Sequence, residues 1–227
     1  SATLAMARMS RELKAQGHDV IALSLGEPDF DTPDFVKEAA KKAVDNNFSH
    51  YTPVPGLAEL REAIAEKLKR YNSLEYTPEQ IVTSTGAKQS IANVCMSLLN
   101  PGDEVLLPAP YWVSYFEIIK LAEGTPVEIP SSIEADFKVS PEQLEAAITP
   151  NTKLLLFSTP CNPSGTVYSK AELEAIAKML EKYPDIYVIC DEIYELINFG
   201  EPHFSMATIT NMKERVVTVN GVSKGFA

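Results

Sequence analysis

Short apolar runs alternate with longer amphipathic stretches over most of the chain after Val82. The short runs have the length of buried strands, and the longer ones repeat apolar residues at the helical period. Strands that alternate with helices in this way form a mainly parallel sheet, so the pattern predicts an α/β fold. The predicted strands are 80–83, 104–107, 126–129, 153–157, 186–190 and 215–219, and the helices between them are 88–99, 112–122, 141–148 and 169–182.

The amino-terminal part has a different pattern. Helix-patterned stretches at 2–16, 33–46 and 57–71 surround a short apolar run at 20–24 and a loop dense in Gly, Pro and Asp. We interpret this part as an arm and outer layer. No internal repeat or low-complexity linker divides the chain into independent domains.

Composition narrows the class of protein. Of the 227 residues, 45% are hydrophobic and 22% are charged, and no apolar run reaches the length of about 18 residues that a membrane span needs. Residues 1–11 lack the charged start, apolar core and cleavage site of a signal peptide. We therefore expect a cytoplasmic protein with no membrane contact.

Charge and cysteine content exclude further classes. The 31 acidic and 20 basic residues leave a net charge of −11, and no Lys/Arg cluster could neutralise a phosphate backbone, so we expect no nucleic-acid partner. Cys95, Cys161 and Cys190 are widely spaced and have neither CxxC nor Cys/His metal-ligand spacing. We expect reduced thiols and no metal site, and we assign the scattered histidines surface or structural roles.

Lys224 is the first candidate for chemistry, because it follows the predicted strand 215–219 after a short turn. Ligands of open α/β sheets gather at the carboxyl ends of strands. A lysine that is desolvated there has a lowered pKa and can form an imine. On this feature alone, a solvated surface lysine is the favoured interpretation.

Asp191 is the second candidate, because it ends a run, 186–190, that is apolar on both faces. A buried carboxylate needs a cationic or proton-donating partner. A protonated pyridine nitrogen would be such a partner, and the pairing would make the ring a strong electron sink. Tyr194, three residues on, could hydrogen-bond a ring oxygen. The alternative is a surface loop with an acidic pair.

Three further turns follow predicted strands. The amides of Gly86, Ala87 and Lys88 open a helix, where an anion such as phosphate could bind. Asn162 lies between two prolines, and Trp112, the only tryptophan, could stack on a flat ring. Taken singly, these residues are also explained by an ordinary strand-to-helix turn, a plain turn and core packing. Together with Lys224 and Asp191, all would lie at one edge of a single sheet.

In order and spacing, these residues resemble the class I aminotransferases of the aspartate aminotransferase type, over the whole chain. The resemblance implies the fold type I architecture for pyridoxal phosphate (PLP), a three-layer α/β/α arrangement around a mainly parallel, mixed sheet. The motifs that carry it are LGEPDF at 25–30, YTPVPG at 51–56, PYW at 110–112, NPSG at 162–165, DEIY at 191–194 and SK at 223–224.

The resemblance implies catalytic roles for Lys224, Asp191 and Tyr194. Lys224 would hold PLP as a Schiff base and carry protons between the substrate Cα and the cofactor. Asp191 would pair with the pyridine nitrogen, and Tyr194 and Asn162 would hold the phenolic oxygen. Trp112 would stack on the ring, and Trp112 and Asn162 would also face the substrate.

The resemblance also implies how phosphate and substrate are bound. Gly86, Ala87 and Lys88 match the phosphate cradle, and Gly26 matches a glycine whose backbone faces the substrate carboxylate. Tyr51 matches a tyrosine that reaches the phosphate of the neighbouring subunit. We therefore expect a homodimer with shared active sites.

Two departures from the family pattern limit this comparison. Gly221 stands where many relatives have a serine that binds the phosphate. Family members also continue beyond Ala227, with an arginine for the phosphate and another for the substrate α-carboxylate. We thus expect an arm and small-domain segment at 1–30 and an incomplete large domain at 31–227, with most of the small domain absent and no activity from this chain alone.

The function expected from the resemblance is amino transfer between an amino acid, aspartate or glutamate first, and a 2-oxo acid. Aromatic amino acids or prephenate come next as substrates. One alternative is a PLP-dependent lyase of the same fold, because the residues named activate Cα without choosing the next step. Another is a non-catalytic PLP-binding regulator, which the charge of −11 disfavours.

Overall fold

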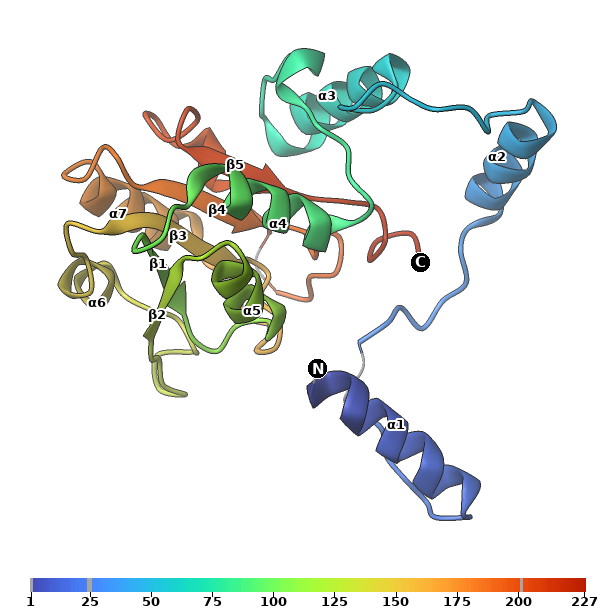
Figure 1. Cartoon of the computed structure of the whole chain (residues 1–227), viewed down its shortest axis with the longest axis horizontal. Helices are drawn as coiled ribbons and strands as arrows, with labels where there is room; N and C mark the ends of the chain where they lie inside the picture. The colour runs from blue at the N-terminus through green and yellow to red at the C-terminus, as the bar shows by residue number, and fades with distance from the viewer. Residues whose placement is uncertain (1, 24–25, 201) are drawn as a thin grey trace.

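The computed structural model describes residues 2–23, 26–200 and 202–227. Their centre is a single sheet with the strand order β2-β1-β3-β4-β5 (Figure 1). All of its pairings are parallel, and the α/β prediction is confirmed. The strands are β1 (Glu104–Pro108), β2 (Thr125–Ile129), β3 (Thr152–Ser158), β4 (Tyr187–Asp191) and β5 (Val216–Val219).

The predicted strand 80–83 is wrong. Pro78–Gln80 forms a 3-10 turn, η1, and the residues after it are irregular. The amide of Thr83 donates to the carbonyl of Pro55 instead of to a strand, so the apolar run packs beside the turn at 53–56. The short run at 20–24 is irregular over 20–23, whereas Ser24, and Leu25 of the LGEPDF motif, lie outside the described residues.

The helices agree with the predicted ranges to within a few residues at each end. Three of them, α5, α6 and α7, form the crossovers between successive strands from β1 to β4. α6 and α7 begin at capping boxes, Ser140 with Gln143 and Ser169 with Glu172, which satisfy the first free amides of each helix. The helices are α1 (Ala2–Ala15), α2 (Asp34–Asp45), α3 (Ala58–Asn72), α4 (Ala87–Leu98), α5 (Ser114–Leu121), α6 (Pro141–Ala146) and α7 (Lys170–Leu180), with a 3-10 turn, η2, at Met206–Thr208.

The strands bury both faces, which makes three layers. On β3, Leu154 and Leu156 join the core formed with α4 and α5, whereas Leu155 and Phe157 join the core formed with α6 and α7. Successive side chains of a strand point to opposite faces, so the nearly continuous apolar run of β3 supplies both cores. This places the site residues at the ends of a rigid sheet.

The amino-terminal helices α1 and α2 lie apart from this layered body, whereas α3 returns to it (Figure 1). α2 buries no residue, while Leu68 of α3 belongs to the core on the α7 side. Among the described residues, no helix combines the length and apolar character that crossing a membrane requires. The division into 1–30 and 31–227 stays a prediction.

Leu155→Ala should lower the free energy of unfolding by about 2–5 kcal/mol, because it empties a fully buried position on the central strand. Urea unfolding followed by circular dichroism measures the change. Leu121→Ala is the matched control, since Leu121 is 72% exposed and should change stability by less than about 0.5 kcal/mol. Equal losses in the two variants would contradict the assignment of the core.

Candidate active site

The carboxyl ends of all five strands lie at one edge of the sheet, because every pairing is parallel. The order β2-β1-β3 reverses the direction of connection at β1, and ligands of open α/β sheets bind at such a switch point. A small pocket lies there, lined by residues that include Tyr111 after β1 and Cys161 after β3. The predicted site residues Trp112, Asn162, Asp191, Tyr194 and Lys224 lie at or just after the same strand ends.

Asp191 is the most buried of the predicted site residues, with 3% of its surface exposed at the end of β4. Its carboxylate accepts hydrogen bonds from the hydroxyl of Tyr115 (2.6 Å) and the amide of Ile193 (3.2 Å). Burial raises the pKa of Asp191, and these two donors only partly oppose it. No lysine, arginine or histidine of the described ranges pairs with it, so a cationic ligand would complete the site.

Tyr115 is a site residue that the sequence analysis missed. It lies in the first turn of α5, is 1% exposed, and packs edge-on against Trp112 at 5.5 Å between ring centroids. Burial, and then the nearby Asp191, raises the pKa of Tyr115 well above its ordinary value, so it is a donor. The hydroxyl of a buried tyrosine needs a hydrogen-bond partner. Here the partner, Asp191, is 76 residues away, so the sequence near Tyr115 does not reveal it.

Asn162 and Tyr194 are in contact, although they follow different strands. The side-chain amide of Asn162 donates to the hydroxyl of Tyr194 at 3.2 Å. Burial raises the pKa of Tyr194, while the bond from Asn162 opposes the shift. Together the two side chains offer donors to a single ligand oxygen.

Lys224 lies beside two other predicted site residues. Its Nζ donates to the backbone carbonyl of Gly26 at 3.1 Å, across 198 residues of sequence. The same Nζ lies 5.8 Å from the centre of the Tyr194 ring. The structure therefore brings the lysine, the glycine near the amino terminus and the β4 end together.

The amino terminus of α4 faces open space. Gly86 precedes the helix with φ +87°, no side chain caps the helix, and a Cβ on Gly86 would meet no atom within 4 Å. The amide of Gly86 donates to Ser84, which leaves the amides of Ala87 and Lys88 for an anion. The Nζ of Lys88 lies 4.9 Å from the ring centre of Trp112, so this terminus adjoins the aromatic side of the site.

Tyr51 and Gly221 stand apart from this group. Tyr51 is fully exposed in the segment between α2 and α3, and it contacts none of the other predicted site residues in the described part of the chain. A Cβ on Gly221 would lie 3.0 Å from Cδ1 of Ile193. The serine of relatives would therefore require Ile193 to shift here.

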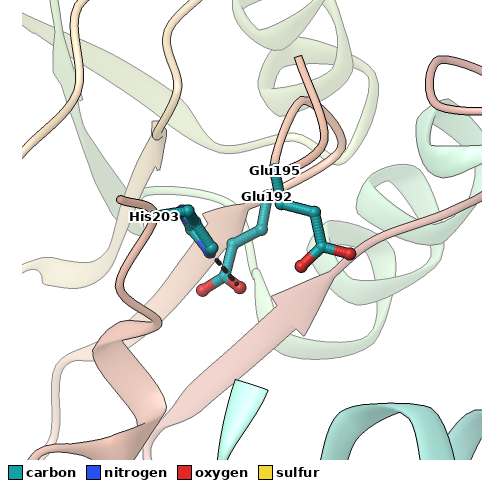
Figure 2. A group of neighbouring side chains, drawn as sticks. All are labelled: Glu192, Glu195 and His203. Atoms are coloured by element: carbon teal, nitrogen blue, oxygen red, sulfur yellow. Dashed lines mark hydrogen bonds and ion pairs between the residues drawn. The ribbon is translucent and has the colours of Figure 1, made fainter. Parts of the chain in front are cut away.

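Glu192, Glu195 and His203 form a second polar group behind the site, which the sequence analysis did not single out (Figure 2). Their ligand atoms lie within 4.8 Å of one another, a spacing at which a metal could bind. Each carboxylate oxygen already pairs with a protein group, whereas Nδ1 of His203 is buried without a hydrogen-bond partner. The partners are His203 and Ser205 for Glu192, and Lys67 and Asn72 for Glu195.

Known proteins resemble this chain closely. A sequence profile described as aminotransferase class I and II matches residues 18–227. The aspartate/prephenate aminotransferase of Cereibacter sphaeroides is 48% identical, over 100% of this chain and 57% of that protein. The one from Nitrosomonas europaea is 49% identical, over 100% of this chain and 58% of that protein.

Solved structures agree with these relatives. The aspartate aminotransferase from Thermus thermophilus with maleate superposes with a TM-score of 0.95 at 45% identity, over 100% of this chain and 59% of that one. An aromatic aminotransferase from Pyrococcus horikoshii superposes with a TM-score of 0.86, over 92% of this chain and 56% of that one. This chain thus spans little more than half the length of the relatives it matches.

Tyr115→Phe should lower the free energy of unfolding by about 1–3 kcal/mol at neutral pH, because the buried Asp191 carboxylate loses a donor. A raised carboxyl pKa means that stability is greatest below the ordinary value of 3.8 and falls as the pH rises. Tyr115→Phe raises the pKa of Asp191 further. The stability that the variant loses relative to the wild type should therefore grow from pH 3.8 to neutral pH. Urea unfolding at the two pH values measures this dependence.

Tyr183→Phe is the matched control for this variant. Its hydroxyl donates to Glu145 at 3.1 Å, before the start of β4, and the variant should lose less stability than Tyr115→Phe. A loss at Tyr115 that did not change with pH would show that Asp191 is not the group affected.

Proposed function

The chain belongs to the class I and II aminotransferase family, and we propose that it forms the cofactor-binding face of a PLP-dependent aminotransferase. The observation that carries this proposal is the Asp191 carboxylate, which is buried at a strand end without a cationic partner in the described residues. A protonated ring nitrogen would compensate that burial. Lys224, a primary amine, is held at the neighbouring strand end.

The other side chains suit the remaining groups of PLP. The free amides of Ala87 and Lys88 suit its phosphate, since helix amino termini bind anions. Asn162 and Tyr194 suit its phenolic oxygen, and the ring of Trp112 suits its flat face. When bound, PLP supplies an electron sink that stabilises negative charge at the substrate Cα.

Each residue then has a defined task in amino transfer. Asp191 would keep the proton on the ring nitrogen, because a carboxylate in this buried place favours a bound cation. Tyr194 and Asn162, which already share a hydrogen bond, would both hold the ring oxygen. Lys224 would hold the cofactor through Nζ, and its amine, when free, would take the proton from the substrate Cα.

The substrates proposed are an amino acid, aspartate or glutamate first, and a 2-oxo acid. The curated relatives are named for aspartate and prephenate and are aminotransferases, which favours transamination over elimination. We also propose a homodimer, because Tyr51 is fully exposed in the segment between α2 and α3. A second copy would give this side chain a phosphate to bind.

Lys224→Ala, made in the protein at its natural length, should abolish the visible absorption of protein-bound PLP, because the amine that bonds the cofactor is gone. Borohydride reduction before digestion should place a PLP adduct on the wild-type peptide that contains Lys224. Lys170→Ala is the control, since Lys170 is exposed at the start of α7, where its contacts are an ion pair with Glu174 and the ring of Phe204. An unchanged absorption band in Lys224→Ala would locate the cofactor elsewhere.

A polypeptide limited to these 227 residues should show no amino transfer from aspartate or glutamate to 2-oxo acids. Relatives are longer, since the chain covers 57% of one of them, and the resemblance places the arginine for the substrate carboxylate outside these residues. A bidentate Arg–carboxylate pair orients the amino acid and supplies much of its binding energy. Ordinary turnover by a sample of confirmed mass would contradict this expectation.

A further inference from the structure

The segment Asp191–Glu195, here called the β4 loop, has two sets of partners. Asp191 and Tyr194 contact Tyr115 and Asn162 in the site. Glu192 and Glu195 contact other elements, and Figure 2 shows their carboxylates gathered with His203 at the end of the strand. Asp191 and Tyr194 of the loop thus face the site, whereas Glu192 and Glu195 bond to other elements.

Glu195 ties the β4 loop to α3. Its side chain is 9% exposed, and it accepts hydrogen bonds from Lys67 and from Asn72 (2.6 Å), more than 120 residues earlier in the chain. Burial disfavours the charged form, but Lys67 and Asn72 outweigh it and leave the pKa of Glu195 below its ordinary value. Lys67 also donates to Asn72 at 2.8 Å, so the three side chains form a closed network.

Glu192 ties the same loop to the segment before η2. It is fully buried, accepts a hydrogen bond from Ser205 Oγ at 2.7 Å, and lies 2.9 Å from Nε2 of His203. Its amide donates to Val219 at the end of β5. Glu192 therefore joins the loop both to the sheet and to the chain that returns toward β5.

Beyond the β4 loop, the chain offers little packing. Leu196 is 59% exposed and Phe199 is 98% exposed. Inside the loop, the amide of Glu195 donates to Glu192 and that of Ile197 donates to Tyr194. A loop with local turns but an exposed continuation depends on its side-chain bonds for its position.

We propose that Glu192 and Glu195 are positioning residues, which hold Asp191 and Tyr194 in the geometry that binds the cofactor. The glutamates act through the backbone of the β4 loop and do not touch the ligand. The part that concerns cofactor binding rests on the proposed function, whereas the mechanical part does not. A metal ion is not the occupant of this group, because the Lys67 ammonium already neutralises Glu195.

The mechanical part is tested on the natural-length protein without PLP by hydrogen exchange of the amides at 193–197. Glu195→Gln puts an amide donor against Lys67 and Asn72, so exchange should become about tenfold faster, as expected for the loss of a hydrogen bond to a charged group. Glu145→Gln is the matched control, because Glu145 of α6 pairs with Lys182 at 2.9 Å, outside the β4 loop. It should leave these amides unchanged.

Milder variants cover the case in which Glu195→Gln does not fold. Lys67→Arg keeps a cationic donor and should retain wild-type exchange, whereas Lys67→Met should accelerate it. Glu192→Gln should show a smaller effect than Glu195→Gln, because both Ser205 and His203 can accept as well as donate. Wild-type exchange in both Glu195→Gln and Lys67→Met would overturn the proposal.

The cofactor part is tested by titrating PLP into the same variants, well below their unfolding temperatures. Glu195→Gln should raise the dissociation constant of PLP about tenfold, in line with the looser loop, and Glu145→Gln should not change it. A variant that is less heat-stable but binds PLP like the wild type would show a structural role only and overturn the proposal. A wild-type protein that binds no PLP would refute the proposed function. The hydrogen-exchange experiment would still test whether Glu192 and Glu195 hold the β4 loop.

Discussion

All strand pairs of this sheet run parallel, and this direction brings every carboxyl end to one edge. The register aligns Ser158 of β3 with Asp191 of β4, and Asp191 with Val219 of β5. Asn162, Asp191 and Lys224 therefore follow three strands that are neighbours in the sheet. A reversed β4 would carry Asp191 to the opposite edge of the sheet, away from the residues that follow β3 and β5.

Within the β4 loop, environment assigns different chemistry to similar side chains. Asp191 has neutral donors and deep burial, so its pKa is raised. Glu195, four residues later, has a lysine and an asparagine, so its pKa is lowered despite burial. Asp191, a carboxylate without a cationic partner among the described residues, costs folding free energy, whereas the nearby Glu195 stabilises the fold. This contrast separates Asp191, which we propose binds the cofactor, from Glu195, which we propose holds the loop in place.

The elements of the fold could be predicted from the sequence, because apolar runs and helical periods are local signals. The strand at 80–83 failed because Ile81 is buried but Val82 is 64% exposed, and Thr83 bonds to Pro55. The apolar character of residues 80–83 does not show whether a neighbouring strand has an unpaired edge to which they could bond. The site residues at strand ends were predicted for the same local reason, and the family resemblance added Gly26. Tyr115 and Glu195 were missed because their partners lie 76 and more than 120 residues away.

The helix α3 links the part of the chain before the sheet to the site. At its start, Gly56 lies so close to Thr83 that only a glycine fits, and the Thr83 hydroxyl donates to Pro55 at 3.2 Å. At its end, Asn72 bonds to Glu195. The segment that carries Tyr51 is therefore joined through one rigid helix to the loop that carries Asp191. In the proposed dimer, Tyr51 would reach the site of the partner subunit. The helix α3 that positions it would also support the β4 loop of its own subunit.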